Sequence, residues 1–406
     1  MRACVLCAAV VAACVPVAAA AQAPISEAQA LAQIGDDHPR VRAIRATVDL
    51  ARADVLDAAR WPNPRLSVDR ESVAGVSETI ATVLQPLPIT GRRTLERDAA
   101  RARVDAASLR AGETERRLRA ELRHAYAQLA AAQVRERELT RTRDRLGELT
   151  TILERREAAG EAAGFDRLRA DREAIDVEAD RLAAAQDRAR AQVILASYLA
   201  GPRDANALVV EELAPGPLEL PPLDALVEQA ERIRGDVLAL QRDAAAARLA
   251  IRAADRRRVP EPEVIAGTKS SSALGGDVGT VFGVQATLPL FDRGGPERAS
   301  ALAREAAAES SLELLRLTLR AEIAVARAAA LDRRTAAARY RATAVATASE
   351  VERIAQVSYD AGERSILELL DAYRSLASAR TRQAMLDAEA RAAEIELEFV
   401  SGWEIP

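Results

Sequence analysis

The chain is poor in the residues that most enzymes use for catalysis. It has 406 residues but only two histidines, His38 and His124, and its three cysteines all fall within the first 14 residues. The rest of the chain can therefore form neither a disulfide nor a cysteine-ligated metal site. The sequence also has no Walker loop, no H-E-x-x-H motif and no G-x-G-x-x-G motif. We therefore expect no enzymatic activity, no cofactor and no bound metal.

Aromatic residues and an excess of one charge are also lacking. Aromatic residues make up 3 % of the chain, and 57 basic against 61 acidic side chains leave a net charge of −4. This balance argues against a nucleic-acid partner, which would favour a basic excess. Beyond the N-terminal segment, no stretch approaches the roughly 20 apolar residues of a transmembrane helix, so a membrane span would have to be made of strands. The abundant Ala, Arg, Glu and Leu instead indicate long or coiled helices.

The N-terminus has the pattern of a secretory signal peptide. Met1-Arg2 is followed by an apolar run that reaches Ala21, and residues 19–21 are small, as a cleavage site requires. We expect residues 1–21 to be removed during export. Residues 11–14 also resemble a lipoprotein signal, so lipidation of Cys14 stays open.

After the signal peptide, the same order of patterns occurs twice. Each copy has a helix, prolines, an alternating strand pair, a very long helix, an Ala-Gly-Glu break and a second helix. Pro62 and Pro64 of the first copy correspond to Pro260 and Pro262 of the second. A duplication this long indicates one structural half used twice. The predicted organisation is a signal peptide (1–21), a first repeat (22–200), a proline-rich connector (201–222), a second repeat (223–403) and a tail (404–406).

Alternating apolar and polar residues predict two strands in each copy, over residues 65–71 and 78–85 and over residues 264–272 and 277–288. Period-2 alternation fits a barrel strand between lipid and a wet interior, and equally an amphipathic strand of a soluble sheet. The export signal and the lack of other sheet material favour the barrel. The side chains expected to face lipid on the last strand are Val278, Phe282, Val284 and Leu288.

Residues 92–156 contain almost no glycine or proline, which predicts a helix on the order of 100 Å long. Leucine or alanine recurs at positions 118, 125, 132, 139, 146 and 153, the seven-residue spacing of a coiled-coil seam. The second copy predicts a similar helix over residues 296–359. Breaks at Gly160 and Gly362, each followed by a further helix, predict two helical hairpins.

These features together resemble the TolC family of outer-membrane efflux channels over essentially the whole chain after the signal peptide. The matching stretches are Trp61-Pro62-Asn63-Pro64, the two Ala-Gly-Glu breaks and the closing Phe399-Val400-Ser401-Gly402-Trp403. Residues 63–72 and 85–93 are similar to the first strand and the strand-to-helix corner of the CzcC-type cation-efflux branch.

The resemblance implies a mixed α and β fold of predominantly long helices. It implies a homotrimer with a shared 12-stranded β-barrel in the lipid of the outer membrane and a periplasmic α-helical barrel. The function it implies is the exit duct of a tripartite efflux system of the resistance-nodulation-division type, exporting heavy-metal cations or small toxic compounds. The expected partners are a periplasmic adaptor and an inner-membrane pump.

The resemblance also assigns a gate by position. The hairpin tips lie at Gly160 and Gly362, and the residues after the second tip line a constriction. Glu368 and Asp371 would form two carboxylate rings in a trimer and would favour cations. Tyr359 and Arg364 match positions that lock the closed tip through bonds to neighbouring helices.

Two other functions stay open from the sequence alone. The same type of duct serves type I protein secretion, and long hairpins also occur in periplasmic adaptors that form no pore. The two hairpins and the two strand pairs favour a duct over an adaptor. The sequence does not specify the exported substrate, the pump or the adaptor.

Overall fold

The computed structural model describes residues 23–161, 164–201, 204–214, 219–273 and 276–403. The predicted signal peptide and the tail lie outside this part of the chain. In chain order the elements are α1 (Glu27–Leu31), α2 (Pro39–Ala59), β1 (Arg65–Val73), β2 (Val76–Pro86), α3 (Arg92–Ala158), α4 (Gly164–Ala196), the 3₁₀ turn η1 (Ala205–Ala207), α5 (Leu223–Ile233), α6 (Gly235–Arg256), β3 (Pro262–Ser271), β4 (Asp277–Ala286), α7 (Gly295–Tyr340), the π-helical segment η3 (Arg341–Val345), α8 (Ala346–Asp360) and α9 (Ile366–Ser401).

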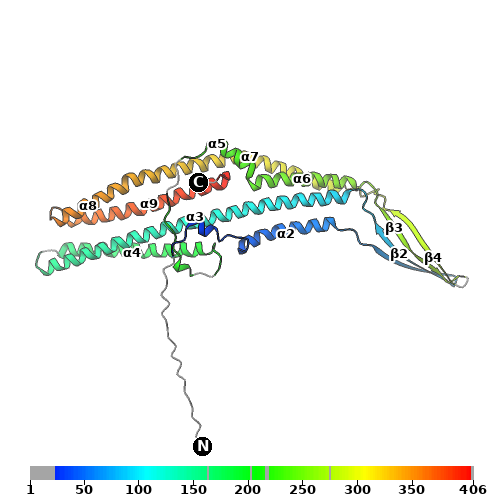
Figure 1. Ribbon diagram of the computed structural model, residues 1–406, viewed down its shortest axis with the longest axis horizontal. Helices are drawn as coiled ribbons and strands as arrows, with labels where there is room; N and C mark the ends of the chain where they lie inside the picture. Colours follow the sequence, from blue (N-terminus) through cyan, green and yellow to red (C-terminus); the bar gives the residue numbers. More distant parts are fainter. Residues whose placement is uncertain (1–22, 162–163, 202–203, 215–218, 274–275, 404–406) are drawn as a thin grey trace, which may run out of the picture.

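The molecule is elongated (Figure 1). Four strands project from one end of a layer of long helices, and the turns between α3 and α4 and between α8 and α9 lie at the opposite end. The C-terminal end of α9 lies near the middle of the long axis, beside α3. The chain is therefore mostly helical with a small antiparallel sheet, as the sequence predicted.

The predicted long helix is confirmed. α3 runs without interruption for 67 residues, about 100 Å at 1.5 Å per residue. Leu139 is only partly buried, whereas the seam leucines Leu118, Leu146 and Leu153 and the neighbouring Leu122 and Leu129 are buried. The buried leucines pack in clusters that include residues of α4 and α9. Burial of this stripe, rather than helix propensity, holds so long a helix in place.

Two other helices differ from the prediction. The helix expected over residues 296–359 is interrupted by the π-helical segment η3, which lies between α7 and α8. The pattern at the start of the first copy divides into the short α1 and the longer α2. His38 caps α2: its Nδ1 accepts from the N–H of Arg40 at 3.2 Å, and its Nε2 lies 3.1 Å from the carbonyl of Tyr198.

The sheet has the strand order β1-β2-β3-β4, with antiparallel neighbours throughout. The central pairing of β2 with β3 joins the two halves of the chain. β1 and β4 are edge strands, with no outer neighbour among the described residues. Unpaired edges leave a row of backbone donors and acceptors without partners.

Leu288 does not lie on β4, and this part of the strand prediction is wrong. Pairing ends at Ala286, whose partner is Pro262, the first residue of β3. Leu288 precedes Pro289, and its carbonyl accepts from the N–H of Leu290 at 2.9 Å. The end of the partner strand, rather than the alternation in β4 itself, sets this boundary.

The start of α6 lies against the backbone of α3. A Cβ atom added to Gly235 would lie 2.4 Å from the carbonyl oxygen of Leu109, well inside contact distance. The N–H of Gly235 also donates to the carboxylate of Glu113 at 3.1 Å. Proline has no N–H to donate and brings a ring into this space, which explains a glycine where the first copy has Pro39.

A chain of ion pairs links α1 to three long helices. Glu27 lies 2.5 Å from Arg123 of α3 and 2.9 Å from Arg391 of α9. From these two arginines the pairs continue to Glu398, to Glu394 and to Arg334 of α7. The N-terminal helix is thereby fixed where α3, α7 and α9 meet.

Candidate functional site

Both long hairpins turn at glycines with a left-handed backbone. Gly160 has φ +82° and Gly362 has φ +75°, values that side chains other than glycine rarely adopt. The N–H of Glu363 donates to the carbonyl of Ser358 at 2.9 Å, and the N–H of Gly362 donates to the backbone carbonyl of Tyr359 at 3.0 Å. These two bonds end α8 in a Schellman motif, and an equivalent pair ends α3 at Gly160.

Tyr359 is buried next to the second turn. It belongs to an apolar cluster with Leu149 and Leu153 of α3 and Leu369 of α9. The guanidinium of Arg156 lies 5.7 Å from the centre of its ring. Burial raises the pKa of the Tyr359 phenol. Tyr359 therefore packs the end of α8 against α3, the helix of the other hairpin.

Arg364 and Glu368 pair with each other at the start of α9. Their charged groups lie 3.0 Å apart, and the N–H of Ser365 lies 3.3 Å from the Glu368 carboxylate. All three side chains are exposed. The resemblance predicted bonds from Arg364 to neighbouring helices, whereas within the described chain its ion pair is to the first turn of the next helix.

Asp371 follows Glu368 by three residues on the same helix and is also exposed. Residues three apart share one helix face, so the two carboxylates lie one turn apart. Their neighbours on the other face, Leu369 and Leu370, are buried in the cluster around Tyr359. The start of α9 thus presents carboxylates on one face and an anchored apolar face on the other.

Two ion pairs between the hairpins were not identified from the sequence. Arg374 of α9 lies 2.9 Å from Glu173 of α4, and Arg145 of α3 pairs with Glu352 of α8. The Arg145 guanidinium also lies 5.6 Å from the ring of Tyr373. Acidic and basic residues recur throughout these helices, so spacing alone does not reveal which pairs cross from one hairpin to the other.

The two faces of the sheet differ mainly in where the charged residues lie. Apolar residues occur on both, and those on the face opposite Phe282 are Val73, Val76, Ile80, Leu84, Ile265 and Val281. Residues opposite one another in the register share a face. One face, which we call the apolar face, carries a single charged residue, Arg70. Its apolar residues are Leu66, Val68, Ala81, Val83, Val264, Ala266, Val278, Phe282, Val284 and Ala286. Phe282 is 81 % exposed, so no described part of the chain covers it.

The opposite face, which we call the polar face, carries the other charged residues of the strands. They are Arg65, Asp69, Glu71, Glu78, Glu263, Lys269 and Asp277. Lys269 lies 2.6 Å from Glu78, and Arg65 pairs with Glu263. The acidic side chains outnumber the basic ones, so this face has a negative charge.

None of the described helices is both long enough and apolar enough to cross a membrane. The described residues also contain no group of three or more His, Cys, Asp or Glu side chains placed to hold a metal ion.

The fold is that of a known class of channel protein. The structure of CusC, described in terms of transmembrane channel formation, superposes with a TM-score of 0.73 over 93 % of this chain and 92 % of that one, at 18 % identity. Residues 30–201 and 226–402 match the family described as outer membrane efflux protein. The chain belongs to this family. It is the outer-membrane exit component of an efflux system.

Two relatives are similar over most of their length. The cobalt-zinc-cadmium resistance protein CzcC of Cupriavidus metallidurans is 24 % identical over 366 residues, 89 % of this chain and 86 % of the relative. The nickel-cobalt-cadmium resistance protein NccC of Alcaligenes xylosoxydans xylosoxydans is 27 % identical over 305 residues, 73 % of this chain and 68 % of the relative. The resemblance to the cation-efflux branch, seen first in two short stretches, therefore extends along the chain.

Proposed function

We propose that the protein is the trimeric exit duct of a tripartite efflux system of the resistance-nodulation-division type, and that it exports heavy-metal cations. The observation that carries this proposal is the sheet with one apolar and one charged face and two open edges. A sheet of this kind is stable in lipid only when its edges are closed by further strands.

Three chains with four strands each would close a 12-stranded barrel. The apolar face would then contact lipid, and the polar face would line a water-filled lumen. The α3–α4 and α8–α9 hairpins of each chain would form the periplasmic α-helical barrel, built from two structural repeats. Their turns lie at the end farthest from the sheet, where a periplasmic adaptor and an inner-membrane pump would approach (Figure 1).

The gate would lie at the turn between α8 and α9. In a trimer, Glu368 and Asp371 would form two stacked rings of carboxylates, which favour cations over anions. Glu368 is already paired with Arg364, so Asp371 would supply more of the effective negative charge. Tyr359 and Arg364 would hold the closed state, the former through a hydrogen bond from its hydroxyl to a neighbouring helix of the trimer and the latter by fixing the start of α9.

The cargo is proposed from two independent sources. The names of CzcC and NccC concern resistance to cobalt, zinc, cadmium and nickel. The polar face of the sheet has more acidic than basic side chains, so it would attract cations along the lumen. Choice among metals would belong mainly to the pump rather than to this chain.

Conductance of the purified protein in a planar bilayer tests this function. We expect small, cation-selective steps that multivalent cations block from the side of the hairpin turns. A duct sealed until its partners open it should conduct after Tyr359→Phe and Arg364→Ser are combined. Folded protein that stays silent even with both changes would contradict a pore and favour an adaptor or scaffold.

A further inference from the structure

The molecule has two open edges, and an exposed aromatic residue lies beside each of them. Across the helical layer α2 packs on α3, α3 on α6 and α6 on α7, so α2 and α7 lie at opposite edges, as β1 and β4 do in the sheet (Figure 1). Trp61, between α2 and β1, is 61 % exposed, and Phe291, between β4 and α7, is 99 % exposed. Large apolar side chains left in water at two edges indicate surfaces that a partner covers.

The turn that carries Phe291 is held by contacts of its own. The N–H of Leu290 donates to the carbonyl of Leu288 at 2.9 Å, and the N–H of Gly294 donates to the Asp292 carboxylate at 3.1 Å. Gly294 has a left-handed φ of +75°, and a Cβ atom added to it would lie 2.5 Å from a carbonyl oxygen of α6. The turn therefore holds Phe291 in its exposed position.

The joint between the two repeats inside the chain shows how such edges meet. There the turn after β2 lies against the start of β3, and the N–H of Leu87 donates to the carbonyl of Pro262 at 2.8 Å. The carboxylate of Glu261 accepts from the Thr90 hydroxyl at 2.6 Å and lies 3.0 Å from the guanidinium of Arg92. An ion pair thus completes this joint beside the sheet.

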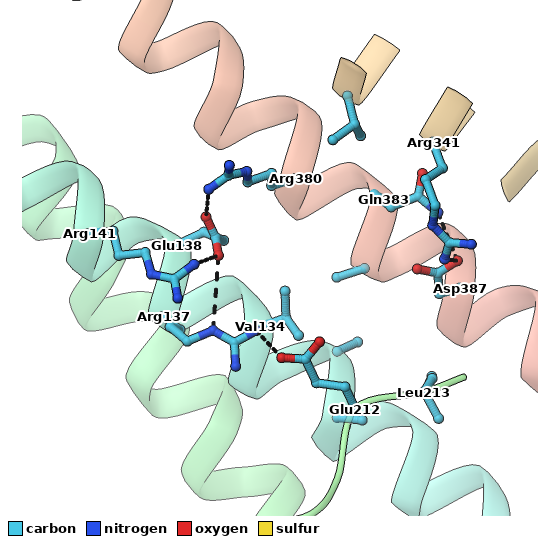
Figure 2. Close-up of a pocket in the computed structure, with 14 residues that line it drawn as sticks. Val134, Arg137, Glu138, Arg141, Glu212, Leu213, Arg341, Arg380, Gln383 and Asp387 are labelled. Carbon is cyan, nitrogen blue, oxygen red and sulfur yellow. Dashed lines mark hydrogen bonds and ion pairs between the residues drawn. The ribbon is translucent and has the colours of Figure 1, made fainter. Parts of the chain in front are cut away.

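Midway along the helices, an ion pair again joins the two repeats. Arg380 of α9 lies 3.0 Å from Glu138 of α3, as Figure 2 shows. Glu138 also lies 2.6 Å from Arg141 on its own helix. Inside one chain, charged side chains therefore connect the repeats at mid-length as they do beside the sheet.

The outer edges repeat the same elements without this ion pair. The turn after β4 and the start of β1 correspond to the turn after β2 and the start of β3. In this correspondence Asn63 replaces Glu261 and Gly295 replaces Arg92, so the ion pair has no counterpart. The turn after β4 is also two residues longer between its proline and its glycine, and Phe291 lies in this longer part. An apolar contact therefore takes the place of the charged one.

The helices beside these edges differ in the same way. Ala99 of α3 and Ala254 of α6 are buried, and the two helices pack on each other. Their counterparts in the repeat, Leu302 of α7 and Leu56 of α2, are exposed. A second copy of the chain offers α2 to α7 and β1 to β4, so it fits both edges at once.

We propose that a second copy of this chain covers these edges, with Phe291 of one chain packed on Trp61 of the next. Arg93 of the same chain supports the Trp61 ring, because its guanidinium lies 5.3 Å from the ring centre and donates to the carbonyl of Ala59. The aromatic contact lies where the strands have ended and the helices begin, so it closes the wall of the duct there. The inference rests on the proposed barrel and adds a register and a seal to it.

The pairing inside the chain also specifies the register between chains. Val83 of β2 pairs with Ala266 of β3, and their counterparts in the repeat are Val284 and Val68. We therefore expect Val284 of one chain to lie opposite Val68 of the next. Both residues belong to the apolar face, whereas a shift of the register by one residue would mix the two faces.

Fluorescence of Trp61 in the purified trimer in detergent tests the aromatic contact. The chain has two tryptophans, so Trp403→Phe leaves Trp61 as the sole emitter. Adding Phe291→Ser should shift the emission to longer wavelength and increase quenching by acrylamide, and the fold should survive because Phe291 is almost fully exposed in its own chain. Phe165→Ser changes an exposed phenylalanine near the first hairpin turn and should alter neither signal. An unchanged signal with Phe291→Ser would show that detergent or lipid alone covers Trp61, and the contact would be wrong.

Cysteine pairs test the register without changing either aromatic residue. Disulfides between chains should form with Val68→Cys and Val284→Cys, or with Ser67→Cys and Gln285→Cys in the same register on the polar face. Val68→Cys with Thr280→Cys should form none, because this position is about 13 Å farther along the strand and a disulfide needs Cα atoms within about 7 Å. A disulfide that forms as readily in this displaced pair would overturn the register and leave the barrel standing. No disulfide between chains in any pair would overturn both.

Discussion

Single residues decide how closely the long helices approach one another. Gly235, at the start of α6, is an example. In Gly235→Ala the new Cβ would lie 2.4 Å from the carbonyl of Leu109, so α6 must move away from α3. Overpacking of this kind costs about 1–3 kcal/mol. We expect a lower melting temperature, measured by circular dichroism in detergent. Gly147→Ala on α3 is the control, because nothing lies within 4 Å of its added Cβ, and it should be neutral or stabilising.

Glu27 is a single side chain that joins α1 to two long helices. Burial alone would raise the pKa of its carboxyl, but the ion pairs with Arg391 and Arg123 outweigh burial and hold the pKa below the usual 4.5. A depressed carboxyl pKa contributes stability above the unfolded-state value, and this contribution is lost as pH falls through the folded-state value. Stability from Glu27 is therefore present at neutral pH and lost in acid.

Glu27→Gln should destabilise the protein at pH 7 by about 2–4 kcal/mol, because it leaves two partly buried arginines without this partner. The difference from the wild type should shrink as the pH falls below 4.5 and through the lowered pKa of the Glu27 carboxyl, because the wild-type carboxyl then becomes neutral as well. Thermal unfolding at several pH values measures both effects. Glu161→Gln changes an exposed carboxylate at the first hairpin turn and should show neither. A loss of stability independent of pH would contradict the role given to the charge.

For strands, the relevant property is which face a side chain occupies. Phe282→Lys places a charge on the exposed apolar face of β4, and at mid-bilayer this costs about 2–4 kcal/mol. We expect a reduced yield of assembled protein in the outer-membrane fraction. Gln285→Lys adds the same charge to the polar face of the same strand and should assemble normally. Normal assembly of the Phe282 variant would show that this face does not contact lipid.

Most elements could be predicted because each leaves a local pattern in the sequence. Alternation marks the four strands, seven-residue spacing marks α3, and glycines mark both hairpin turns. Features that depend on a distant partner could not be predicted in this way. The end of β4 before Leu288 depends on where β3 begins, and the π-helical segment η3 follows no residue signal that we recognise.

The candidate site was predictable only in part for the same reason. The positions of Tyr359, Arg364, Glu368 and Asp371 came from the family resemblance, but their partners did not. Burial of Tyr359 against α3 and pairing of Arg364 with Glu368 require three-dimensional contacts.

In the whole molecule, the two carboxylates near the second turn should act through the trimer. Asp371→Asn should reduce the cation preference of the pore, and Glu368→Gln should reduce it less, because Arg364 already pairs with Glu368. Reversal potentials in a KCl gradient measure this, with Tyr359→Phe and Arg364→Ser added if the duct is sealed. Glu350→Gln on α8 removes an exposed carboxylate paired with Arg353 and serves as control. Unchanged reversal potentials in both test variants would rule out the rings.

The open edges of the sheet allow a direct test of the assembly. Within one chain, β1 and β4 are three strand spacings apart, about 14 Å, whereas a disulfide needs Cα atoms within about 7 Å. The native cysteines all lie in the first 14 residues, so introduced pairs can be followed without background once the signal peptide is removed. We would combine Val68→Cys on β1 in turn with Val278→Cys, Thr280→Cys or Val284→Cys on β4. The three pairs test three possible registers between β1 of one chain and β4 of the next.

Any disulfide in these variants must join two different chains, because the strands are too far apart within one. A closed barrel of three chains predicts covalent species that stop at the trimer on non-reducing gels, for at least one of the three pairs. Single-cysteine variants should give no species beyond a dimer. Covalent species larger than a trimer would indicate an open array of chains rather than a closed barrel. Oxidised samples that remain monomeric with all three pairs would mean that β1 of one chain does not lie beside β4 of another.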